Sequence, residues 1–95
     1  MSYFAWNSEK NEILKSERGV SFEEAVLHIE QGEILEVLEH PNQQRYPGQR
    51  IFVIEMAGYA YLIPFVESSS EIFLKAIIPS RKATGEYLRR REEDG

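Results

Sequence analysis

The spacing of the apolar residues changes once in this 95-residue chain, and that change constrains the fold more than any other feature. Before Gly32 the spacing is helical, since Phe22, Ala25, Val26 and Ile29 occupy positions i, i+3, i+4 and i+7. After Gly32 the chain divides into short runs rich in β-branched and aromatic residues, separated by turn residues. The pattern therefore predicts an α+β domain in which helices precede a set of strands.

Two helices are expected in the first third of the chain. Asn7 or Ser8 can cap a helix that ends near Gly19, because glycine adopts the left-handed conformation at a helix end at low cost. Ser21, followed three residues later by Glu24, forms a capping-box pattern that begins the second helix. Both helices are therefore bounded by signals in the sequence itself.

Short strands and a final helix are expected in the rest of the chain. The β-prone runs are residues 3–6, 34–39, 50–55, 59–66 and 72–78. Turn residues separate the last four runs, which predicts a four-stranded antiparallel sheet between about residues 33 and 79. Pro64 lacks an N–H and indicates an edge position or a bulge. Ser80 caps a final helix through Leu88, which fades into the arginines at 89–91. The expected order is β-α-α-β-β-β-β-α, in a single domain of residues 1–95.

The composition excludes several kinds of site. The chain has no cysteine, which rules out disulfides, thiolate nucleophiles and cysteine zinc sites. It has no phosphate-loop, dinucleotide or metal-binding motif, so we expect no metal and no cofactor. The start lacks the features of a signal peptide, and no apolar run approaches the roughly 20 residues that span a bilayer. We therefore expect a cytoplasmic protein without a membrane partner.

Charge is distributed unevenly along the chain. Residues 1–39 contain three basic and nine acidic residues, whereas residues 40–91 contain eight basic and four acidic residues. Binding to a polyanion needs local positive charge, and the second half has it although the whole chain carries −5.

The basic residues of the second half are the main functional candidates. Arg45 and Arg50 flank Tyr46 in and after a loop dense in turn residues. Arg81 and Lys82 fall in the first turn of the final helix, where positive side chains oppose the helix dipole while free N–H groups attract anions. Cations in this position indicate a site for a phosphate or a carboxylate.

Other candidates have both a structural and a functional interpretation. His28 lies beside the apolar stripe of the second helix, which favours a structural or solvated role. His40 precedes Pro41 at a strand end, where its imidazole either enters a cleft or remains an inactive loop residue. Glu55 lies in an apolar strand, and its carboxylate is expected to be in an ion pair rather than in a catalytic role. Trp6 either stacks on a ligand base or belongs to the core, and the core is favoured.

Several blocks of the sequence resemble the BrnT-type toxins. Residues 18–25 read Arg-Gly-Val-Ser-Phe-Glu-Glu-Ala, similar to the His-Gly-Val-Ser-Phe-Glu-Glu-Ala signature of that family. Residues 4–7 with the Lys-Asn pair at 10–11 resemble its Phe-x-Trp-Asp entry, and Arg50 matches an arginine that leads into the first hairpin strand. Residues 78–84, Ile-Pro-Ser-Arg-Lys-Ala-Thr, resemble its Ile-Ser-Ala-Arg-Lys-Ala-Thr segment.

The resemblance implies a RelE-like fold and a type II toxin–antitoxin pair. Such a toxin is an endoribonuclease that cleaves RNA without a metal and inhibits translation. A DNA-binding antitoxin, typically of ribbon-helix-helix type, neutralises it, and operator DNA is contacted only through the antitoxin. Three positions depart from the family pattern, since Arg18 replaces a histidine, Leu14 replaces an asparagine and Ile51 replaces an aromatic residue. If either the histidine or the asparagine that this chain lacks contributes to catalysis in relatives, the ribonuclease activity of this chain is weak or divergent.

The basic residues and the resemblance together predict a catalytic set. Guanidinium groups are always charged and bind phosphate oxygens in bidentate fashion, so Arg50 and Arg81 are predicted to hold the phosphorane as it forms. His40 is the candidate general base, because histidine is the side chain that most often takes that role. The further residues predicted to contact RNA are Lys82, Arg45 and Tyr46, the last as a possible stacking residue.

Two other interpretations of the same residues stay open. The chain can be a non-catalytic module whose basic face binds an acidic partner protein, with the arginines as anchors. It can also be a small structural domain with unrelated duties. Growth arrest on expression without a neighbouring gene favours the nuclease, whereas harmless expression with tight partner binding favours the module.

Overall fold

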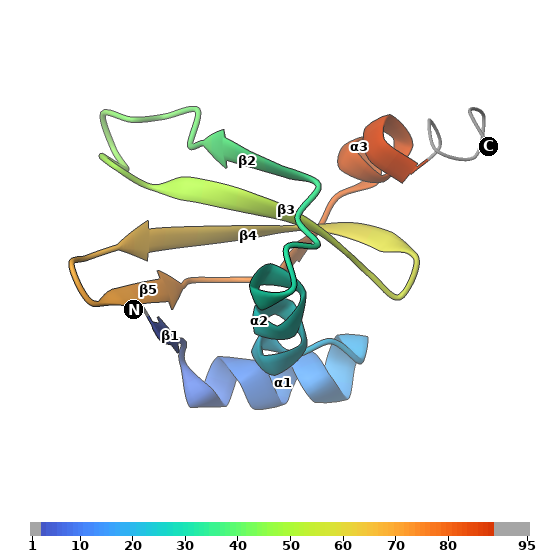
Figure 1. Ribbon diagram of the computed structural model, residues 1–95. Helices are drawn as coiled ribbons and strands as arrows, with labels where there is room; N and C mark the ends of the chain where they lie inside the picture. Colours follow the sequence, from blue (N-terminus) through green and yellow to red (C-terminus); the bar gives the residue numbers. More distant parts are fainter. Residues whose placement is uncertain (1–2, 89–95) are drawn as a thin grey trace.

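The computed structural model describes residues 3–88 as one mixed sheet with helical segments on both sides (Figure 1). The helices are α1 (Ser8–Arg18), α2 (Phe22–Glu30) and α3 (Arg81–Ala83), and α3 continues into the π-helical turn η1 (Thr84–Leu88). The strands are β1 (Tyr3–Ala5), β2 (Glu36–Glu39), β3 (Arg50–Met56), β4 (Tyr59–Glu67), β5 (Glu71–Leu74) and β6 (Ile78–Pro79). The arginines at 89–91 lie outside the described residues. No helix within residues 3–88 is long and apolar enough to cross a membrane.

The sheet has six strands of mixed orientation, which corrects the expected four-stranded antiparallel sheet. The strand order is β1-β5-β4-β3-β2, and β6 also pairs with β4. The expected antiparallel neighbours are present from β2 to β5. β1 adds a parallel strand, with Phe4 beside Ile72 of β5. Parallel pairing needs a long connection, and the two helices and three strands between β1 and β5 supply it.

The expected last strand, residues 72–78, is divided in two. β5 pairs with the end of β4, and β6 pairs further back along β4. Three residues separate β5 from β6, whereas only two residues of β4 lie between the two pairings, so the β5–β6 side has one extra residue. Pro64 lies in that interval and has no N–H for the ladder, while its carbonyl accepts from the Lys75 N–H at 2.8 Å. The prediction that Pro64 marks an edge or a bulge is confirmed.

The helix boundaries follow the capping signals. Asn7 is the cap of α1, since its side-chain oxygen accepts from the Lys10 N–H at 2.9 Å, and Gly19 ends the helix at a φ of 69°. Ser21 accepts from the Glu24 N–H at 3.1 Å at the start of α2. The two predicted helices are therefore confirmed.

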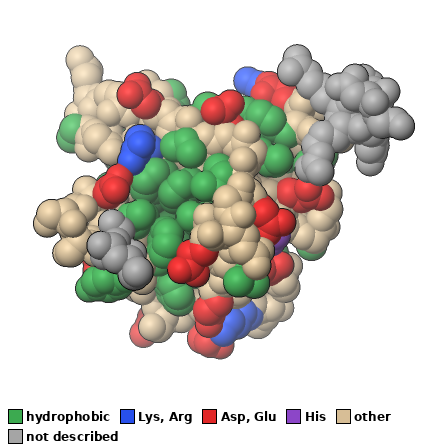
Figure 2. All heavy atoms as spheres, in the orientation of Figure 1, with side chains coloured by type: hydrophobic (Ala, Val, Ile, Leu, Met, Phe, Trp, Pro, Cys, Tyr) green, Lys and Arg blue, Asp and Glu red, His purple; other side chains and the backbone are tan. Residues whose placement is uncertain are grey.

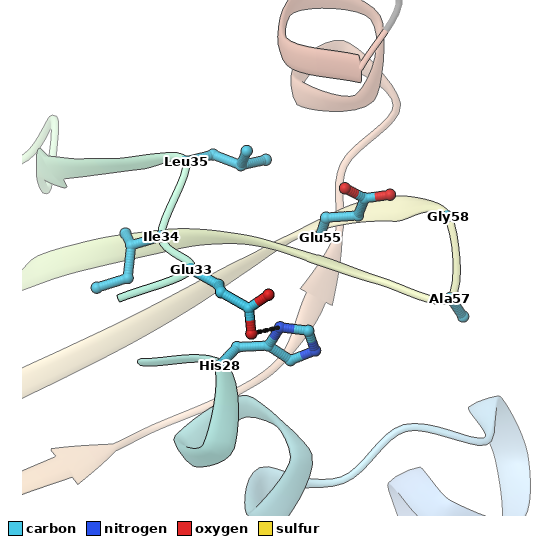
Figure 3. Close-up of a pocket in the computed structure, with 7 residues that line it drawn as sticks. All are labelled: His28, Glu33, Ile34, Leu35, Glu55, Ala57 and Gly58. Atoms are coloured by element: carbon cyan, nitrogen blue, oxygen red, sulfur yellow. Dashed lines mark ion pairs between the residues drawn. The ribbon is translucent and has the colours of Figure 1, made fainter. Parts of the chain in front are cut away.

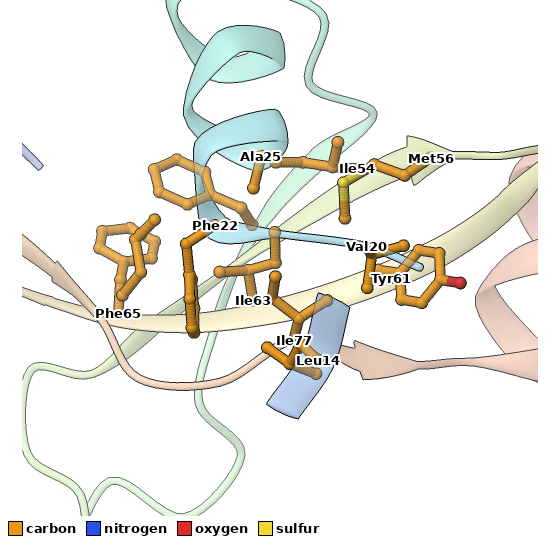
Figure 4. Packing of buried hydrophobic residues seen from close by; sticks show 12 residues of the cluster. Leu14, Val20, Phe22, Ala25, Ile54, Met56, Tyr61, Ile63, Phe65 and Ile77 are labelled. Carbon is orange, nitrogen blue, oxygen red and sulfur yellow. The ribbon is translucent and has the colours of Figure 1, made fainter. Parts of the chain in front are cut away.

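The strands present two different faces, because side chains alternate along β3 and β4. We call the side covered by α1 and α2 the α1/α2 face, and the side met by α3 and η1 the α3 face. The core of the α1/α2 face is large (Figure 4) and consists of Leu14, Val20, Phe22, Ala25, Phe52, Ile54, Met56, Tyr61, Ile63, Phe65, Leu74 and Ile77. On the α3 face the buried cluster is smaller and consists of Val53, Ala60 and Ala83, and Ile51 is also buried there. Figure 2 shows that hydrophobic side chains gather over the strands to the left of α2, so the two helices leave part of their own face open.

Asn11 connects the two N-terminal helices. Its side chain is 3% exposed, its oxygen accepts from the Phe22 N–H at 2.8 Å, and its amide donates to the Glu23 carboxylate. That hydrogen bond is the main reason why the pKa of Glu23 lies below its ordinary value. Lys15 also contacts Glu23, at 3.3 Å, and this hydrogen bond is the main cause of the raised pKa of Lys15. The start of α2 is thus held against α1 by polar contacts as well as by packing.

Candidate functional site

Three side chains with positive or titratable groups surround one tyrosine ring at the end of the sheet where β3 begins. The His40 ring lies 4.4 Å from the Tyr46 ring, between centroids, at an interplanar angle of 41°. The Arg45 guanidinium carbon is 5.5 Å and the Lys75 Nζ is 5.9 Å from the centroid of the same ring. We call these four residues the Tyr46 cluster. A cation within about 6 Å of an aromatic face is attracted to it, so the ring holds positive charge beside itself.

Turn chemistry fixes the loop that carries three of these residues. The Asn42 side-chain oxygen accepts from the Arg45 N–H at 3.1 Å, and its carbonyl accepts from the Tyr46 N–H at 3.0 Å. Gln43 accepts from the N–H of Gly48 at 3.1 Å, and Gly48 has a φ of 73°, a value that glycine adopts readily. The sequence therefore places Arg45 and Tyr46 by local hydrogen bonds.

The hydrogen bonding of His40 defines its neutral tautomer. Its Nδ1 accepts from the Asn42 N–H at 3.0 Å. In a neutral imidazole only one nitrogen accepts, so Nε2 carries the proton and is a donor. While this bond is intact, His40 is suited to donate to an anion. It becomes a general base at Nδ1 only after the Asn42 N–H has moved away.

Lys75 follows β5, which is separated from β3 by β4, and its side chain completes the cluster from there. Leu74 belongs to the core of the α1/α2 face, so alternation directs Lys75 to the α3 face. Its Nζ donates to the side-chain oxygen of Gln49 at 3.2 Å, and Gln49 is only 5% exposed. Lys10 of α1 donates to the Lys75 carbonyl at 2.9 Å. Sequence reasoning missed Lys75, because only the sheet register brings it to the loop.

Arg50 lies near this end of the sheet but on the α1/α2 face. Its guanidinium stacks over the Phe65 ring at 5.1 Å from the centroid and forms an ion pair with Glu67. Glu39 is its direct cross-strand neighbour on β2. Arg50 thus has one carboxylate as a partner and a second beside it, which reduces its attraction for a phosphate.

Arg81 lies at the opposite end of the sheet. It is exposed and lines a hollow with Tyr59, the first residue of β4, whereas Arg50 stacks on Phe65 near the end of the same strand. Six residues of strand separate these two positions, which is about 20 Å at roughly 3.4 Å per residue. The structure therefore does not bring Arg50 and Arg81 together, and one phosphate cannot contact both.

Lys82 borders an apolar groove on the α3 face. The groove has a volume of about 260 Å³ and lies between β2 and the C-terminal helical segment. Leu38 and Leu62 contribute from the sheet, while Glu86 and Tyr87 contribute from η1. This lining is mostly apolar, so the groove suits a hydrophobic side chain better than a nucleotide phosphate.

A second hollow, of about 390 Å³, lies between the end of α2 and the β3–β4 turn (Figure 3). His28 and Glu33 form a pair there, 3.5 Å between Nδ1 and Oε1. Figure 3 shows the Glu55 carboxylate directed away from that pair, so the three groups do not converge. Within residues 3–88, no three His, Cys, Asp or Glu side chains are arranged to hold a metal ion.

Trp6 belongs to the α1/α2 core. Its ring stacks on Phe22 with centroids 5.9 Å apart, and it packs against the buried cluster. Of the two interpretations left open for Trp6, the structure supports the core residue.

No family model, no curated protein and no solved structure matches this chain. A functional argument therefore depends on the contacts described above and on the sequence blocks that resemble BrnT-type toxins.

Proposed function

We propose that this chain is a toxin of the BrnT type with a RelE-like fold, a metal-independent endoribonuclease that binds RNA over the Tyr46 cluster. The observation that carries the proposal is the contact of Tyr46 with His40, Arg45 and Lys75 on one ring. An aromatic ring beside positive charge is the combination that binds single-stranded nucleic acid, through base stacking and phosphate contacts. A cognate antitoxin, of ribbon-helix-helix type by the resemblance, is the expected partner.

The cluster supplies charge where RNA cleavage needs it. When the 2′-hydroxyl attacks the neighbouring phosphate, its proton passes to water, the P–O2′ bond forms, the P–O5′ bond breaks, and the 5′-oxygen leaves as an alcohol after taking a proton from water. Negative charge develops on the phosphate oxygens during this step, and fixed donors stabilise that charge. Arg45 and Lys75 are positive, and the Nε2–H of His40 is a third donor beside them. In this arrangement they take the role that the sequence assigned to Arg50 and Arg81.

The other basic residues that the sequence predicts to bind RNA have different roles in the proposed function. Arg50 is paired with Glu67 on the α1/α2 face, so it positions the start of β3 rather than the phosphate. Arg81 and Lys82 lie beyond the groove and contact RNA only if the strand continues across the α3 face.

Purified protein, freed of any antitoxin, is expected to cleave single-stranded RNA in the presence of EDTA. Tyr46→Ala is expected to lower the rate about 100-fold or more, because it removes the ring that holds the three donors. Arg81→Ala is the matched control and is expected to retain most of the activity. Cleavage that survives Tyr46→Ala and is lost in Arg81→Ala would contradict the site, and no cleavage by any form would contradict the nuclease.

The binding module is the second candidate, and the apolar groove of the α3 face favours it. In that case Arg45 and Tyr46 are interface anchors, since arginine and tyrosine are enriched among residues that dominate binding energy. Expression in cells separates the two functions. Growth arrest that Tyr46→Ala relieves supports the nuclease, whereas harmless expression supports the module.

A further inference from the structure

β2 is an open strand at one edge of the sheet. It pairs with β3 alone, and in Figure 1 no described element lies on its outer side. The His40 N–H just after it donates inward to Gln49 at 2.9 Å. Inward and outward residues alternate in an antiparallel ladder, so Val37 and Glu39 direct their N–H and C=O groups outward. Such groups are a template for a further strand.

The outward N–H of Val37 is only weakly occupied. It donates to the carboxylate of Glu36, its neighbour in the chain, at 3.3 Å in an exposed position. A carbonyl from an added strand replaces such a bond readily, because the carboxylate that is released is then solvated.

The side chains of this edge have a simple pattern. Val37 and Leu38 are 40% and 41% exposed and lie on opposite faces of the sheet. Glu36 and Glu39 flank them, so β2 reads acidic–apolar–apolar–acidic.

The groove of the α3 face begins at the same strand. Leu38 forms part of its wall together with Ile51 and Val53 of β3. Residues directly opposite each other on neighbouring strands point to the same face. An apolar residue placed opposite Leu38 therefore lies over the groove.

The charge of β2 selects the partner. Both charged residues of the strand are glutamates, Glu36 and Glu39, and the cation in register with them is Arg50, which lies opposite Glu39 and is already ion-paired with Glu67. In a symmetric antiparallel pair of two copies, directly opposite residues share a face, so either Val37 meets Val37 and Glu36 lies opposite Leu38, or Leu38 meets Leu38 and Glu39 lies opposite Val37. Both registers place a glutamate opposite an apolar residue, whereas a cationic segment places an opposite charge on both glutamates, so a cationic segment fits better than a second copy.

We propose that the β2 edge binds an extended segment of another protein as an added strand, and that this segment reads basic–apolar–apolar–basic. The basic residues face Glu36 and Glu39, and the apolar residues cover Val37 and Leu38. Main-chain hydrogen bonds supply affinity in this mode, and the alternating side chains supply specificity. The proposal does not depend on RNA cleavage, because it uses neither the Tyr46 cluster nor any catalytic step.

Nuclear magnetic resonance with two capped hexapeptides tests the proposal on the full chain. The probe has the sequence Thr-Lys-Val-Val-Lys-Thr, and its control has glutamate in place of both lysines. The lysine peptide is expected to shift the amide signals of Val37 and Glu39, and the glutamate peptide is expected to leave them unchanged. Absence of any shift at these amides with the lysine peptide at about 5 mM would overturn the proposal, since even millimolar affinity is then detectable.

Two sets of variants separate the backbone contact from the charge contact. Val37→Pro removes the outward N–H without touching a bond to β3, so it is expected to fold and to weaken the lysine peptide about fivefold or more. Val37→Thr keeps the N–H and is the control. Glu36→Lys combined with Glu39→Lys is expected to reverse the preference toward the glutamate peptide. Glu17→Lys combined with Glu30→Lys changes the net charge equally and is expected to keep the preference.

Three results would overturn the proposal. The first is equal binding of the lysine peptide to Val37→Pro and Val37→Thr. The second is a reversed preference in the Glu17/Glu30 control, because the attraction is then a property of the net charge. The third is a concentration-dependent dimer that Val37→Pro abolishes, which assigns the edge to a second copy.

Discussion

The two faces of the sheet differ in how completely they are closed and in how their charges are paired. The α1/α2 face has a core of twelve buried residues, and Arg50 at its end is paired with Glu67. The α3 face has a buried cluster of three residues, with Ile51 buried beside it, and keeps an apolar groove of about 260 Å³. Its basic residues at the Tyr46 cluster contact an aromatic ring and a buried glutamine rather than a carboxylate. One face therefore stabilises the fold, and the other leaves positive charge accessible.

The largest difference between the faces is expected in stability. Phe22 is fully buried on the α1/α2 face and stacks with Trp6, so Phe22→Ala is expected to cost about 3–5 kcal/mol of unfolding free energy. Leu62 is half-buried in the groove on the α3 face, so Leu62→Ala is expected to cost less than about 2 kcal/mol. Denaturant unfolding of both variants measures the two values, and equal costs would contradict the comparison.

The next difference is expected in activity. Lys75→Ala removes a donor from the Tyr46 cluster and is expected to lower RNA cleavage about 100-fold, and it also leaves the side-chain oxygen of Gln49 without its donor. Arg50→Ala removes a cation that Glu67 already neutralises and is expected to lower it less than about tenfold. Cleavage assays in EDTA compare the two, and the opposite ranking would move the site to the α1/α2 face.

A smaller effect is expected at the junction of the two helices. Asn11→Leu keeps the volume of the side chain but leaves the buried Phe22 N–H without its acceptor, which is expected to cost about 1–3 kcal/mol. Ser8→Ala, at an exposed position one residue after the cap of α1, is the control and is expected to change stability little. A neutral effect of Asn11→Leu would mean that packing alone holds the helices together.

The smallest expected effect is a pH dependence of stability. Because the pKa of Glu23 is lowered in the folded state, its contribution is present above the ordinary value of 4.5 and is lost as the pH falls below it. Asn11 is the main cause of the lowered pKa, so Asn11→Leu is expected to lose less stability than the parent between neutral and acidic pH. Unfolding curves at several pH values measure this, and parallel losses would contradict the assignment.

Much of the fold could be predicted because its signals are local. The caps at Asn7 and Ser21 and the glycine at the end of α1 depend on neighbouring residues only, and each acts in the structure as expected. The bulge at Pro64 follows from a missing N–H, which is also a local property. The parallel pairing of β1 with β5 could not be predicted, since nothing in a short β-prone run indicates a partner far along the chain.

The candidate site was only partly predictable for the same reason. His40, Arg45 and Tyr46 lie in one loop and were recognised together, and the structure keeps them together. Lys75 enters through the register of β4 with β5, which the sequence does not encode locally. Residue type and the resemblance both favour Arg50, and neither reveals that Glu67 lies on the adjacent strand β4, two residues beyond the direct partner of Arg50.

Mapping the RNA surface by nuclear magnetic resonance tests the central claim most directly. A single-stranded RNA with 2′-O-methyl groups binds without being cleaved, because the attacking hydroxyl is blocked. The account predicts shifts concentrated at residues 40–49 and at Lys75, and predicts that they weaken as salt is raised. Shifts centred on Arg81 and Lys82, with residues 40–49 unchanged, would contradict it.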